Sequence, residues 1–116
     1  MKTIYQRDKS GPQALTIEQL PEQRELHITT RKASGGVLVT RAAAHRRDGS
    51  SLIHAFGMGI KGMGDFSQVV AQRSIPRITA RAVEQQHSSV IERLAEIKVL
   101  VELHYANQSE RNAAHA

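Results

Sequence analysis

Cysteine is absent from this chain of 116 residues, and so is tryptophan. Without cysteine the chain has no disulfide, no thiolate metal ligand and no thiol redox chemistry, a pattern that suits the cytoplasm. Aromatic residues make up only 3% of the sequence, as two Phe and two Tyr, so the core must be built from Val, Ile, Leu and Ala. The same scarcity argues against recognition of single-stranded nucleic acid by base stacking.

Long apolar runs are also missing. No stretch of about 18 apolar residues occurs, and the first dozen residues carry no apolar segment behind their charges. We therefore expect neither an export signal nor a membrane partner, and we expect the protein to be cytoplasmic.

The length fits a single domain with a core of its own. We expect an N-terminal arm over residues 1–13, an α+β domain over 14–108 and a frayed tail over 109–116. The arm has one alternative, because residues 3–5 also have the composition of a short edge strand. The formal charge of +5 and the pI near 10.1 favour an acidic partner, either nucleic acid or an acidic protein surface.

The front of the chain has β character. Residues 16–23 begin with Thr16 and carry Gln19 three positions later, a capping-box pattern that predicts one helical turn stopped by Pro21. Residues 25–31 alternate apolar and polar side chains, which predicts a half-buried strand. The Gly-containing segment 32–36 then predicts a turn.

A β-hairpin is predicted around Asp48 and Gly49, because two β-capable runs flank a dipeptide that suits tight hairpin turns. A two-residue loop there pairs Arg41 with Phe56. One face of the hairpin then carries apolar and small side chains that suit packing against a helix: Leu38, Thr40, Ala42, Ala44, Ile53 and Ala55.

The back of the chain is helical. Residues 65–75 leave two alternatives open, a short helix capped by Asp65 or another strand, and Pro76 ends either. From Thr79 to about Asn107 no Gly or Pro occurs, and apolar residues recur at spacings of three and four, which predicts one long amphipathic helix. The predicted fold class is therefore α+β, a small antiparallel sheet built around a central hairpin and packed against this helix.

The helix also offers an interaction seam, formed by Val83, His87, Val90, Leu94, Ile97 and Val101. This seam spans three heptads and can pack on the sheet of its own chain or pair with a second copy in a homodimer.

Four glycines, Gly57, Gly59, Gly62 and Gly64, match the dinucleotide pattern G-x-G-x-x-G literally. A dinucleotide fold needs that turn between a parallel strand and a helix, and here the preceding strand belongs to a hairpin. We interpret the segment instead as a bulged or flexible connection, with a phosphate-contacting loop carrying Lys61 as the alternative.

Basic residues cluster around the predicted hairpin, and a projecting basic β-ribbon can track phosphates or enter a major groove. The leading hypothesis is therefore a non-enzymatic protein that contacts nucleic acid through this hairpin and the Gly-rich loop. The alternative is a protein inhibitor or adaptor of the phage or plasmid type, which acts on a nucleic-acid-handling or defence complex through the same surface or the C-terminal helix. The candidate contact residues are Arg31, Lys32, Arg41, Arg46, Arg47 and Lys61.

No catalytic, cofactor or metal site is expected. No Ser or Thr is accompanied by an acid and a base, and no carboxylate pair stands out. The six histidines include no pair spaced i, i+4, and only His45 and His54 are neighbours in the predicted hairpin. Two neutral ligands without a third make a poor metal site.

Overall fold

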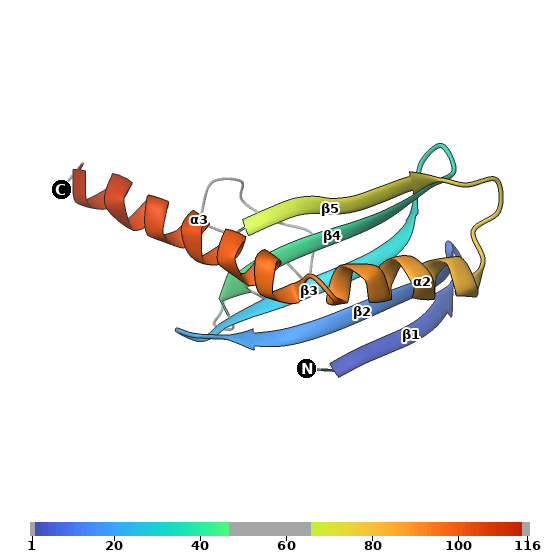
Figure 1. Ribbon diagram of the computed structural model, residues 1–116, viewed down its shortest axis with the longest axis horizontal. Coiled ribbons are helices and arrows are strands. Elements are labelled where there is room, and N and C mark those ends of the chain that lie inside the picture. The colour runs from blue at the N-terminus through green and yellow to red at the C-terminus, as the bar shows by residue number, and fades with distance from the viewer. Residues whose placement is uncertain (1, 47–65, 115–116) are drawn as a thin grey trace.

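A computed structural model describes residues 2–46 and 66–114 (Figure 1), and within these ranges the chain forms five strands followed by two helices. The strands pair in chain order, each antiparallel to the next, and the predicted α+β class with an antiparallel sheet is confirmed. Their bounds are β1 (Lys2–Asp8), β2 (Gly11–Leu20), β3 (Arg24–Ala33), β4 (Val37–Arg46) and β5 (Phe66–Ser74), and the helices are α2 (Ala80–Ile91) and α3 (Leu94–Ala114).

The sheet has one buried face and one open face. Alternate residues of the central strands are buried, as in β3, where Leu26, Ile28 and Thr30 have no exposed surface while their neighbours are partly accessible. Because side chains alternate across a strand, this pattern places one set beneath α2, which contacts β2 to β5, and turns the other set outward. The predicted helix-packing set of β4 is confirmed, since Leu38, Thr40, Ala42 and Ala44 are fully buried.

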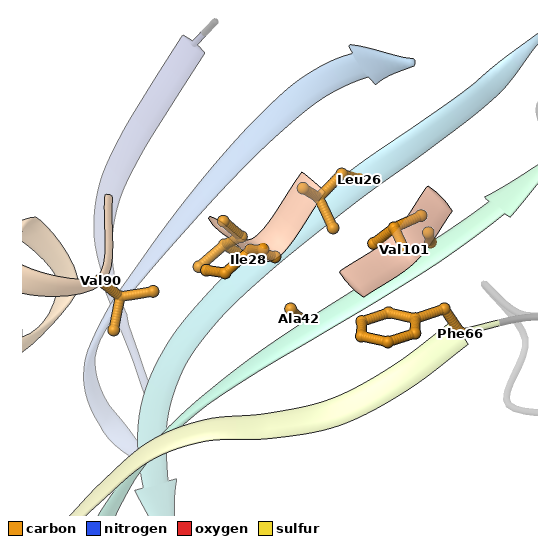
Figure 2. Packing of buried hydrophobic residues seen from close by; sticks show 8 residues of the cluster. Leu26, Ile28, Ala42, Phe66, Val90 and Val101 are labelled. Carbon is orange, nitrogen blue, oxygen red and sulfur yellow. The ribbon is translucent and has the colours of Figure 1, made fainter. Parts of the chain in front are cut away.

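The main apolar cluster lies between the sheet and the helices (Figure 2). It joins Leu26, Ile28 and Phe66 from the strands to Val90 of α2 and Val101 of α3. Among the described residues, Phe66 is the one aromatic side chain in its buried set, so this part of the cluster is otherwise aliphatic, as the composition required. A smaller cluster forms around Leu38 and Val83 near the start of α2.

The predicted long helix is interrupted, and this prediction is corrected. It begins as expected, with the Thr79 side chain accepting a hydrogen bond from the Ala82 amide. At Arg93 the amide bonds to the carbonyl of Val90, three residues back, and the tightened turn separates α2 from α3. The Arg93 side chain donates to the Val70 carbonyl of β5 at 3.2 Å, which ties the interruption to the sheet. Beyond it, α3 extends past the end of the sheet (Figure 1).

Two local predictions near the N-terminus are settled by strand pairing. Residues 16–20 belong to β2 and not to a helical turn, because β2 pairs with β1 on one side and β3 on the other, and these ladders outweigh a local capping pattern. Residues 2–8 form the edge strand β1, which is the alternative to a free arm. Residues 66–74 likewise adopt the strand alternative, as β5.

The predicted pairing of Arg41 with Phe56 is wrong. Arg41 pairs with Thr29 of β3 and with Val69 of β5, so both edges of β4 are occupied and Phe56 is not its partner. The local sequence favoured pairing with the run directly after the turn, whereas β4 pairs with β5, further along the chain. The Asp48-Gly49 turn itself lies outside the described residues, and so do Ile53 and Ala55 of the predicted helix-packing face.

A row of polar side chains crosses the buried face beneath α2. His87 lies between two threonines, with its Nε2 2.7 Å from the Thr16 hydroxyl and its Nδ1 2.8 Å from the Thr30 hydroxyl. The Thr30 hydroxyl also lies 2.7 Å from that of Thr40, which accepts from the Gln86 side chain at 3.1 Å. These buried groups are satisfied by one another, which removes the cost of placing them in an apolar layer.

Candidate nucleic-acid interface

Three segments that are distant in sequence meet at one end of the sheet, at the right of Figure 1: residues 7–12, 31–37 and 73–81. The meander brings them together, because every second turn of an antiparallel sheet lies at the same end and α2 also begins there. In the turn between β3 and β4, Gly35 and Gly36 have φ angles of 81° and 72°, a left-handed conformation that favours glycine. The Gly36 carbonyl accepts from the Ile75 amide at 3.3 Å and so joins this turn to the end of β5.

These three segments carry a concentrated positive charge, which we call the basic end. Their only carboxylate is Asp8, and its two oxygens accept from the Ser10 amide and the Gln13 side chain, each at 2.7 Å. Within the described part of the chain, none of the Lys and Arg side chains of the basic end has an ion-pair partner. They are Arg7, Lys9, Arg31, Lys32, Arg73, Arg77 and Arg81.

One depression opens at the basic end on the helix side of the sheet. Arg7 and Lys9 contribute from the β1–β2 turn, Lys32 comes from β3, and Ile75 and Ile78 form part of its wall. None of the described residues that line it is a carboxylate. Like charges held together repel one another, so a bound anion would relieve that repulsion as well as form its own contacts.

A second depression lies on the open face, across the β3–β4 turn from the first. Arg31 and Arg41 line it from adjacent strands together with Thr29 and Val39, and Lys32 contributes to both depressions. The Arg41 guanidinium donates to the Ser67 hydroxyl at 3.1 Å, which orients it along this face. The two depressions together offer cations on both sides of one turn.

The structure divides the basic cluster predicted from the sequence. Arg31, Lys32 and Arg41 lie on or beside the basic end, as described above. Arg46 ends β4 at the opposite end of the sheet, where it pairs with Arg24. Arg31 pairs with Val39, seven residues earlier on β4, which places Arg46 roughly 23 Å away along the strand at about 3.3 Å per residue.

The other predicted contact residues lie outside the described residues. They are Arg47 and Lys61, with the loop glycines Gly57, Gly59, Gly62 and Gly64.

Five cations of the basic end were missed by reasoning from sequence: Arg7, Lys9, Arg73, Arg77 and Arg81. They are scattered over three segments, and no local run of charge marks them. Only the strand order and the direction of each strand place them together. A correct prediction of the antiparallel strand order could have grouped these five cations, whereas no sequence motif marks them.

The predicted helical seam packs within one chain. Val83, His87, Val90, Ile97 and Val101 are buried, and Leu94 is partly buried against the main cluster. The large apolar side chains that remain exposed on the helices are those of Val99, Leu100 and Leu103 of α3. No helix in residues 66–114 is long and apolar enough to cross a membrane.

Comparison with known proteins gives no relative: no family model, no curated protein and no solved structure matches this chain.

Proposed function

We propose that this chain is a non-enzymatic, cytoplasmic nucleic-acid-binding protein that holds the phosphate backbone at its basic end. The observation that carries the proposal is the gathering of seven Lys and Arg residues, with one internally bonded carboxylate, on three segments that meet at one end of the sheet. Phosphate contacts of this kind supply most of the affinity of sequence-independent binding.

Contacts to the backbone fit this surface better than contacts to bases. Arg24 stacks on the Tyr105 ring at 3.8 Å, which leaves Tyr5 as the one exposed aromatic ring among the described Phe and Tyr residues. The basic end instead offers flexible charged side chains around a turn, a chemistry that recognises phosphate without reading sequence. A duplex is therefore the favoured ligand, because stacking platforms are what single-strand binders require.

The two depressions suggest a path for the backbone. A strand of nucleic acid that crosses the β3–β4 turn would place one phosphate near Arg7, Lys9 and Lys32 on the helix side. It would place another near Arg31 and Arg41 on the open face. Lys32 would then lie between the two phosphates, which makes it the cation shared by both contacts.

The test is a titration of labelled random-sequence duplex DNA at several salt concentrations. At least three phosphate contacts give a logarithmic slope of about −2.7 or steeper, which weakens binding roughly 40-fold between about 50 and 200 mM salt. A single-stranded DNA of the same length should bind less tightly. Wild-type protein with no measurable duplex affinity at the lowest salt would refute the proposal.

A second candidate function is protein binding, as an inhibitor, an adaptor or a homodimer. Val99, Leu100 and Leu103 favour it, because their exposed fractions of 52%, 41% and 54% are high for large apolar side chains. Sedimentation of the free protein tests the homodimer, and pull-down with an acidic polypeptide tests an acidic protein surface. Absent DNA binding together with either result would favour this second function.

A further inference from the structure

A second group of chemically reactive side chains lies on the open face, at the opposite end of the sheet from the basic end. Glu25 of β3 pairs directly with His45 of β4 on one side and with Gln19 of β2 on the other. His27 follows two residues after Glu25 on the same strand, and therefore on the same face. Three adjacent strands thus contribute to one small cluster.

The geometry of this cluster is compact. The His27 Nε2 lies 3.4 Å from a Glu25 carboxylate oxygen, and the rings of His27 and His45 have centroids 4.6 Å apart. One ligand atom from each of the three residues lies within 4.8 Å of the other two. Ligands at about 2.1 Å from a tetrahedral zinc ion are separated by roughly 3.4 Å, so small side-chain rotations would bring all three to one ion.

The carboxylate is held in place by a neighbouring side chain. The Gln19 side-chain nitrogen donates to the other oxygen of Glu25 at 3.0 Å. Glu25 and His27 are also partly buried, with side-chain exposures of 22% and 29%, and all three candidate ligands project from paired strands. Hydrogen bonds that orient ligating groups from outside are a regular part of protein metal sites.

We propose that Glu25, His27 and His45 form a binding site for a divalent cation of the zinc type. Two imidazoles and one carboxylate suit Zn²⁺, whereas Mg²⁺ and Ca²⁺ prefer ligand sets made of oxygen. Three protein ligands leave a fourth position for water or for a group from a partner. Sequence reasoning found no third ligand beside His45, because Glu25 and His27 are about twenty positions away and only strand register brings them together.

The test is calorimetric titration of the full-length protein with Zn²⁺, and separately with Mg²⁺. We expect one Zn²⁺ per chain and no comparable binding of Mg²⁺. The substitutions His27→Ala, His45→Ala and Glu25→Gln should each weaken Zn²⁺ binding by at least 10-fold. Gln19→Leu removes the hydrogen bond to the carboxylate and should weaken it by about 10- to 100-fold, the range found for groups that orient ligands.

The matched control is His104→Gln, which removes a partly exposed histidine from α3 on the other side of the sheet. Its Zn²⁺ affinity should equal that of the wild type, and circular dichroism should show that every variant is folded. Substitution of Co²⁺ adds an independent readout, because its visible absorption intensifies in tetrahedral coordination. Absence of Zn²⁺ binding by the wild type, or binding that survives the double substitution His27→Ala/His45→Ala, would overturn the proposal.

Discussion

His87 makes the stability of this fold depend on pH, and the direction follows from its surroundings. Burial lowers the pKa of His87 below its usual value of 6.5. The hydrogen-bond row explains why protonation of the neutral His87 imidazole is unfavourable. If each hydroxyl donates its one proton along the row, Gln86 donates to Thr40, Thr40 to Thr30 and Thr30 to the Nδ1 of His87. The Nε2–H then donates to Thr16.

Protonation of Nδ1 would break this order, because Thr30 would face two donors and its own proton would lose its acceptor. The unfolded chain takes up a proton near pH 6.5, while the folded chain resists it. Above pH 6.5 His87 is neutral in both states and its contribution to stability is complete. As pH falls from 6.5 toward the lowered pKa, stability declines with a limiting slope of about 1.4 kcal/mol per pH unit, the value for one proton.

Urea unfolding between pH 8 and pH 5 measures this slope, and His87→Gln isolates the contribution of His87 from those of the other histidines. Gln cannot span both threonine hydroxyls, but each hydroxyl keeps a second partner, Thr3 for Thr16 and Thr40 for Thr30. The variant should therefore lose about 0.5 to 1.5 kcal/mol at pH 8 for each hydrogen bond that is lost. Its stability should then fall less steeply on acidification than that of the wild type.

If His87→Gln does not fold, the wild type still provides the test through an NMR titration of its imidazole signals. His87 should remain neutral below pH 6.5 and carry its proton on Nε2. Titration of His87 at or above pH 6.5 would refute this account of the buried row.

Three further predictions concern stability, and thermal or urea unfolding checks each. Ile97→Ala should lower the free energy of unfolding by about 2 to 5 kcal/mol because the side chain is buried. Leu94→Ala should lower it by less, because Leu94 is only partly buried. The reverse order would contradict the packing described. Thr79→Ala should cost about 1 kcal/mol, since it removes the side-chain bond to the Ala82 amide, and Thr79→Ser serves as the control that keeps it. Gln23→Gly should raise stability by up to about 1 kcal/mol, because Gln23 holds a φ of 60° that glycine adopts without strain; a loss of stability would argue against that conformation.

The periodic parts of this fold were predicted correctly from the sequence. The alternation around Leu26 and Ile28 predicted β3, and the buried set of β4 was correct, because burial on one face imposes a period of two. Thr79 and the stripe that follows it predicted the start and buried face of the helices, because a cap and a period of 3.6 are local signals.

Pairing between strands that are distant in the chain could not be predicted from the sequence. Arg41 pairs with Val69 across a long connection, and no local property of either residue specifies that choice. At the interruption, the Arg93 side chain bonds to a carbonyl of β5, which is again a tertiary contact. For the same reason Arg7 and Arg73 did not appear as neighbours of Lys32, although all three belong to the basic end.

The proposed function requires that the basic end, and not positive charge in general, contacts nucleic acid. Two variants of equal net charge test it, one with Arg7, Lys9 and Lys32 changed to Gln, and one with Lys2, Lys98 and Arg111 changed to Gln. Each loses three positive charges, and the second set lies away from the depression that the first set lines.

The measurement is the salt dependence of duplex DNA binding by these two variants and the wild type. We predict that the first variant flattens the logarithmic salt slope by up to about 2.7, that is about 0.9 for each lost contact, while the second stays close to the wild type. Equal losses in both variants would contradict the account, because they would show that binding follows net charge and not the surface assembled at the end of the sheet.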